Sequence, residues 1–208
     1  KKAGKSFDAM VGAISAIGAA AGGIIGGVMA LKKALDFGAE GAKVAQTEDS
    51  FKNLMRSLGA GPSVLQDLRD AARGTVDDMT LMSGTLALVA GVSDDMARSM
   101  VDASPRLMEI AKAANKLNPA LGTTAHMYES ISIGIKRGQP LILDNLGLTI
   151  KVGEANEKYA KQLGKTVEAL TAEEKQMALL EATLEAGDRM IQQVGGNTDS
   201  MGDNFERA

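Results

Sequence analysis

Residues 9–31 are the stretch that most limits how this chain can fold, because they contain no charged side chain and a single polar one, Ser15. As an α-helix this stretch would be about 34 Å long, enough to cross the hydrocarbon core of a bilayer. At 100° per residue, six of its large apolar side chains share one face: Met10, Ile14, Ile17, Ile24, Val28 and Leu31. We therefore expect one long Gly-rich apolar helix over residues 1–38, with that face toward lipid.

Glycines occupy the opposite face of this expected helix, at spacings of four residues: Gly18, Gly22 and Gly26, and also Gly23 and Gly27. Small residues at this spacing let two helix backbones approach closely. Each glycine costs about 1 kcal/mol relative to alanine in a helix in water, so the helix would be weak alone. The apolar residues favour membrane insertion by only about 3 kcal/mol. A conditional membrane helix and a helix buried against protein both remain open, and a signal peptide is a third alternative.

Composition excludes several functional classes. The chain has no cysteine, which excludes a disulfide scaffold and any Cys-based metal site or nucleophile. His126 is the single histidine, so neither a His-based metal site nor a catalytic triad can be built. The net charge of −3 gives no basic footprint for a specific nucleic-acid site. Low aromatic content, 3%, favours extended helices over a compact sheet. We expect a non-enzymatic protein without cofactors.

Helix start and stop signals divide the rest of the chain into short helices. A connector over 39–50 precedes an apolar helical face at 51–58, and further helices are predicted from Ser63, from a Thr75–Asp78 capping box, and from Ser93. Ser104-Pro105 and Asn118-Pro119 each predict a new helix start. Gly138 and Gly147 predict breaks around a short helical turn. Three acidic pairs fall in expected first turns and are interpreted as capping groups: Asp77-Asp78, Asp94-Asp95 and Glu173-Glu174.

The last helix is the most regular of the series. A charged helix over 154–163 precedes it, and Thr171 with Glu174 forms a capping box at its start. Its apolar residues then follow at steps of three and four, the spacing of a coiled-coil seam: Met177, Leu180, Leu184, Ile191 and Val194. We expect this seam to face another helix, from this chain or from another copy. The predicted organisation is all-α, an irregular bundle or elongated array divided into 1–38, 39–50, 51–153, 154–196 and a polar tail over 197–208.

Residues 130–186 contain three short motifs in a fixed order: Gly-Gln-Pro-Leu at 138–141, Leu-Gly-Leu-x-Ile at 146–150 and Leu-Thr-x-Glu-Glu-Lys at 170–175. Together with the helices ahead of them and the upstream apolar stretch, they make residues 50–190 resemble the tape measure protein of long-tailed, siphovirus-like bacteriophages. No single motif is diagnostic. Members of that family are commonly longer, and the first residue is Lys1, so we expect a fragment.

The resemblance implies a structural virion protein that lies in the tail tube lumen or at the tail tip, sets tail length and leaves at DNA ejection. Its implied partners are further copies of itself, the tube protein, tip or baseplate hub proteins, and the host membrane during ejection. The rotational symmetry of the tube makes a trimer one expected form. Two alternatives from other classes are a pore-forming or toxin-like helical membrane protein, based on the glycine spacing, and a soluble helical adaptor, based on the capping signals and the heptad segment.

Overall fold

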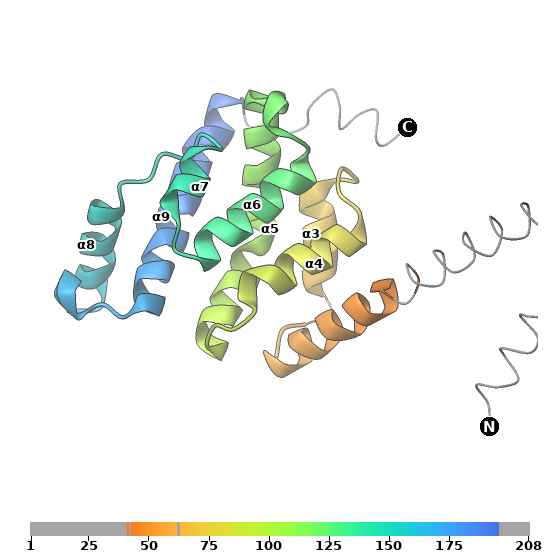
Figure 1. The fold of residues 1–208 in the computed structure, drawn as a ribbon, viewed down its shortest axis with the longest axis horizontal. Helices are drawn as coiled ribbons and strands as arrows, with labels where there is room; N and C mark the ends of the chain where they lie inside the picture. The colour runs from red at the N-terminus through yellow and green to blue at the C-terminus, as the bar shows by residue number, and fades with distance from the viewer. Residues whose placement is uncertain (1–40, 42, 62, 196–208) are drawn as a thin grey trace, which may run out of the picture. The chain divides into compact units, whose positions relative to one another are not determined.

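The structure, a computed structural model, describes residues 41, 43–61 and 63–195 and divides the chain into two compact units, 1–46 and 47–208. The described part is all-helical and contains no strand (Figure 1). Of the first unit, residue 41 and residues 43–46 are described, and all are helical. The connector predicted over 39–50 is therefore helical wherever it is described. The apolar stretch 9–31, with its glycine face and its lipid-facing side chains, lies outside the described residues.

In the second unit, a helix that ends at residue 57 is followed by α3 (Ser63–Ala72), α4 (Asp78–Val89), α5 (Asp94–Leu117), the 3-10 turn η1 (Pro119–Leu121), α6 (Thr124–Lys136), α7 (Pro140–Asp144), α8 (Val152–Gln162), η2 (Val167–Ala169) and α9 (Ala172–Gln193). The helices form a bundle-like array around α5, which packs against α3, α4, α6 and α9. In the second half of α5, most of the helix circumference is buried. This explains why α5 is the centre of the core.

Pro105 lies inside α5, so the helix start predicted at Ser104-Pro105 is wrong. A proline inside a helix leaves the carbonyl four residues earlier without its N–H partner. Here that carbonyl belongs to Val101, and the Ser104 hydroxyl donates a hydrogen bond to it at 2.6 Å. Burial of the flanking helix faces then maintains one continuous helix through the proline.

Two other predicted starts are shifted. The N-cap of α4 is Asp77, whose carboxylate accepts from the Thr80 N–H, rather than Thr75. The Thr75 hydroxyl instead donates to the Ala72 carbonyl. The break at Asn118 is real, but it leads into η1, and α6 begins only after the Thr123 cap.

The predicted breaks after α6 and α7 are confirmed by the backbone. Gly138 follows α6 with φ +61°, and Gly147 follows α7 with φ +84°, both in the left-handed region that glycine adopts without strain. Pro140 is the first residue of α7. The capping box of α9 is also present, with Thr171 and Glu174 each accepting the backbone N–H of the other.

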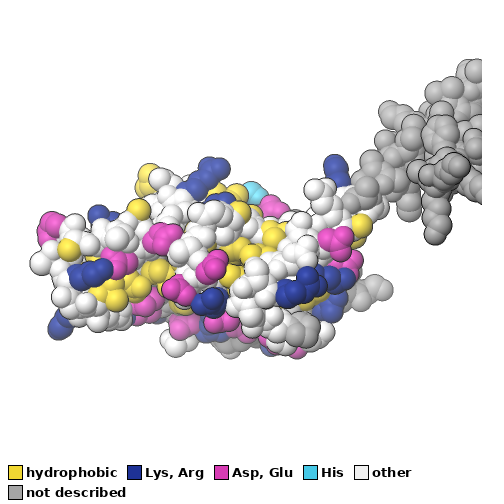
Figure 2. All heavy atoms as spheres, turned by 90° about the horizontal axis from the view of Figure 1, so that it is seen from below, with side chains coloured by type: hydrophobic (Ala, Val, Ile, Leu, Met, Phe, Trp, Pro, Cys, Tyr) yellow, Lys and Arg dark blue, Asp and Glu magenta, His cyan; other side chains and the backbone are white. Residues whose placement is uncertain are grey.

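The core of the second unit is built from Leu, Ile, Met, Val and Ala with two buried aromatics, Phe51 and the fully buried Tyr128. Tyr128 packs against the face of α4 at Gly84, where a Cβ would lie 2.5 Å from its ring. Because Gly84 has no side chain, α4 and α6 can approach closely at this level. The surface seen in Figure 2 has positive and negative side chains interspersed, with hydrophobic side chains between them.

Candidate functional site

The seam residues predicted on α9 lie at its contact with the rest of the bundle. Leu180 and Ile191 are buried, whereas Met177, Leu184 and Val194 are partly buried and pack against the core. The buried surface of α9 is wider than a heptad seam, because α9 packs against α5, α6 and α8 together. It also includes Ala178, Leu179, Thr183, Ala186 and Met190. A seam with another copy stays a prediction.

In each acidic pair found in the sequence, at least one carboxylate has a structural partner; in Asp94-Asp95 it is Asp95, which pairs with Arg98 at 2.8 Å. Asp77 caps α4, and Asp78 pairs with Arg69 through two hydrogen bonds of 2.9 and 2.7 Å. The Asp78–Arg69 hydrogen bonds lower the pKa of Asp78. Glu173 accepts the Ser93 N–H at 3.0 Å and so caps α5 from the first turn of α9. These carboxylates satisfy orphan N–H groups at helix starts and pair with arginine.

Within residues 41, 43–61 and 63–195, no three His, Asp or Glu side chains gather as a metal site. His126 is exposed in the first turn of α6, and its ring lies against Gly122. In the same part of the chain, no helix is long and apolar enough to span a membrane.

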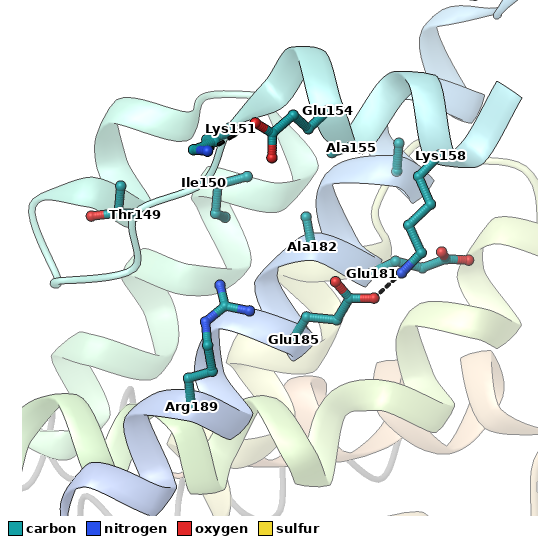
Figure 3. Close-up of a pocket in the computed structure, with 11 residues that line it drawn as sticks. Thr149, Ile150, Lys151, Glu154, Ala155, Lys158, Glu181, Ala182, Glu185 and Arg189 are labelled. Carbon is teal, nitrogen blue, oxygen red and sulfur yellow. Dashed lines mark hydrogen bonds and ion pairs between the residues drawn. The ribbon is translucent and has the colours of Figure 1, made fainter. Parts of the chain in front are cut away.

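A hollow of about 390 Å³ lies between α8, α9 and the irregular residues 149–151 (Figure 3). Three cationic and three acidic side chains line it, together with Thr149, Ile150 and three alanines: Lys151, Lys158 and Arg189, and Glu154, Glu181 and Glu185. The hollow is therefore polar and balanced in charge.

Two of the cations in the hollow are paired. Lys151 donates to Glu154 at 2.8 Å, within the first turn of α8. Lys158 of α8 and Glu185 of α9 point toward one another and form an ion pair (Figure 3). Their hydrogen bond raises the pKa of Lys158. Arg189 lies one helical turn beyond Glu185 on α9. A guanidinium can donate two parallel hydrogen bonds to a carboxylate or phosphate.

Sequence reasoning did not identify this hollow. It predicted the charged helix and the capped helix after it, but the pairing of their faces depends on residues 163–171, which reverse the chain direction. A weak signal was present, because α8 carries alternating charge and few large apolar residues, as an exposed helix does.

Comparison with known proteins assigns no family to this chain. No family model, curated protein or solved structure matches this chain.

Proposed function

We propose that this chain is a structural component of the tail of a long-tailed bacteriophage, a tape measure protein. It lies in the lumen of the tail tube or at the tail tip, contributes to setting tail length, and leaves when the DNA is ejected. In this role the protein acts through helix packing and assembly rather than through catalysis.

The observation that carries the proposal is the order of three motifs in residues 130–186, which resembles that family. Each motif lies at a helix boundary. Residues 138–141 join α6 to α7, residues 146–150 lead from α7 toward α8, and residues 170–175 begin α9. The motifs together mark one succession of turns and caps.

Two features of the described helices support a structural role. The fold is all-helical, and the acidic pairs most suggestive of catalysis cap helices or form ion pairs. The implied partners are further copies of the chain, in a trimer as one form, together with the tube protein and the tip or baseplate hub proteins. Residues 9–31 would contact the host membrane during ejection.

Mass spectrometry of purified tailed particles tests the proposal. We expect peptides from residues 47–195 in intact particles, in a molar ratio to the tube protein well below one, since tape measures run in a few copies through a tube of many subunits. A second abundant tail protein, quantified in the same sample, controls for recovery. Particles that form and infect without this chain would contradict the proposal.

A further inference from the structure

A second hollow, of about 450 Å³, lies between the helix that ends at residue 57 and the helices α3 and α4. Unlike the hollow beside α9, it is walled mainly by apolar side chains: Phe51, Met55, Ala60, Leu65 and Met82. Three of these, Phe51, Met55 and Met82, are each 4% exposed and form its floor. We call this hollow the apolar groove. Its volume falls within the range of roughly 300–1,000 Å³ of sites that hold small ligands, which are likewise lined mostly by apolar side chains with a few polar groups.

The apolar groove follows one face of the helix that ends at residue 57. Its lining residues on this helix begin at Glu48 and end at Arg56, and they recur at the spacing of a single helix face. This length of helix rises about 12 Å, so the groove is elongated along the helix axis. The floor includes Met55 and Met82, whose unbranched side chains adapt their shape to what they contact. An elongated, apolar and adaptable surface fits a single linear hydrocarbon chain.

Three charged side chains stand at the rim of the apolar groove: Glu48, Lys52 and Arg56. Lys52 pairs with Glu48, so these two charges cancel. The exposed Arg56 donates a hydrogen bond to the Asn53 Oδ1 atom at 3.0 Å, and within residues 43–61 and 63–195 it forms no ion pair. A guanidinium carries five N–H donors, so Arg56 can bind a further acceptor. The rim therefore has one uncompensated positive charge, two helical turns away from Glu48.

We propose that the apolar groove binds a free fatty acid, a single hydrocarbon chain that ends in one carboxylate. The chain lies along the helix over Phe51, Met55 and Met82. The carboxylate lies beside Arg56, whose guanidinium can donate two parallel hydrogen bonds to it. Repulsion by Glu48 disfavours the reverse orientation. The site lies wholly within residues 48–82 and does not depend on the proposed role in a phage tail.

Isothermal titration calorimetry of the full chain with decanoate, at neutral pH and below its critical micelle concentration, tests the proposal. We expect one decanoate bound per chain, and about 10-fold weaker binding of octanoate, because two fewer methylene groups are removed from water. Decyltrimethylammonium has the same chain length with a cationic head, and it should bind about 10-fold more weakly than decanoate, because it cannot accept hydrogen bonds from Arg56. Equal affinities for the three probes would overturn the proposal.

Two arginine substitutions separate the head-group contact from a general effect of charge. Arg56→Gln should weaken decanoate binding about 10-fold and so remove most of the advantage of decanoate over decyltrimethylammonium. Arg137→Gln, at an exposed position directly after α6, is the matched control and should bind decanoate as the parent does. Both positions are exposed, so neither substitution disturbs core packing. Equal decanoate affinities of the two variants would overturn the proposal.

Ala60→Leu tests the apolar part of the site, because a larger side chain at this partly buried position fills the groove. It should weaken the binding of decanoate and of decyltrimethylammonium alike, and urea unfolding checks that the variant is folded. Unchanged binding would overturn the proposal. Two other occupants have their own signatures. Self-association in sedimentation velocity that decanoate or Ala60→Leu abolishes would assign the groove to a second copy of the chain. Binding to phosphatidylglycerol vesicles that Arg56→Gln abolishes, without binding of decanoate, would assign it to a membrane surface, and either result would overturn the proposal.

Discussion

Among the described glycines, Gly187 of α9 has the least room for a side chain. A Cβ built there would lie 3.0 Å from Cγ2 of Ile110 on α5, and the Cγ1 and Cδ1 atoms lie closer still. Because Ile110 is β-branched and fully buried, its side chain cannot move aside by rotating a single distal bond. We expect Gly187→Ala to lower the free energy of unfolding by about 1–3 kcal/mol, despite the better helix propensity of alanine.

Urea unfolding of residues 1–208 measures this change, and Gly153→Ala on α8 is the control. A Cβ at Gly153 meets no atom within 4 Å, so that substitution should be neutral or slightly stabilising. An equal effect of the two substitutions would show that α5 and α9 are not in close contact at Gly187.

Tyr128 places a polar group at the centre of the core. The Thr85 hydroxyl donates to the Leu81 carbonyl at 2.9 Å, and the hydroxyl oxygens of Thr85 and Tyr128 are hydrogen-bonded to each other at 3.0 Å. Burial raises the pKa of Tyr128 to about 12, and hydrogen bonds with Thr85 and Ser104 oppose that rise. Tyr128 therefore stays protonated in the folded chain at a pH where an exposed tyrosine ionises.

This raised pKa predicts a loss of stability at high pH. Between pH 10 and 12 the unfolded chain releases the Tyr128 proton while the folded chain retains it, so the free energy of unfolding falls with rising pH. Over this range the native protein should lose up to about 3 kcal/mol more than Tyr128→Phe does. At pH 7, Tyr128→Phe should cost about 1 kcal/mol for the lost hydrogen bond. Parallel pH profiles for the two proteins in urea unfolding would contradict the assignment.

At the scale of elements, the apolar spacing of α9 predicted that this helix is packed, but not how many helices it contacts. The heptad spacing predicted a single seam, whereas α9 packs against helices on several sides, so burial at the seam positions is uneven. Leu180 is 2% exposed, and Leu184 is only partly buried. We expect Leu180→Ala to lower the free energy of unfolding by about 2–5 kcal/mol and Leu184→Ala by about 1 kcal/mol. The reverse order in chemical unfolding would contradict the packing of α9 described here.

The apolar element over residues 9–31 remains a prediction from sequence. If Gly18, Gly22 and Gly26 form a close-packing face, Gly22→Ile should leave liposome binding of a peptide of residues 1–38 intact, yet reduce its oligomerisation and dye release. The parent peptide is the control. Dye release by Gly22→Ile equal to that of the parent would reject close packing, and a parent that does not bind liposomes would favour a helix buried against protein.

Capping residues, glycines and prolines predicted most helix boundaries. Where such a prediction was wrong, a different hydrogen bond had formed in place of the expected cap. Gly138, Gly147 and the Thr171 capping box are set by backbone geometry, which neighbouring residues determine. Pro105 was misinterpreted because the carbonyl freed by the proline is satisfied by Ser104, and burial on both sides of it maintains a single helix. That compensation depends on tertiary packing.

At the scale of the whole molecule, the all-helical class could be predicted because low aromatic content and repeated capping signals act along the entire chain. The hollow between α8 and α9 could not, since Lys158 and Glu185 lie on separate helices whose facing depends on the intervening loop. Seam residues could be assigned to a packed helix face, but the sequence does not say which helix lies opposite.

We propose that this chain is carried in a phage tail and is released at DNA ejection. The most direct test compares the amount of this chain, by quantitative mass spectrometry, in intact particles and in the same particles after triggered DNA ejection, normalised to the tube protein. We predict a defined amount in intact particles and strong depletion after ejection. Retention of the full amount in emptied particles, or its absence from intact ones, would contradict the account.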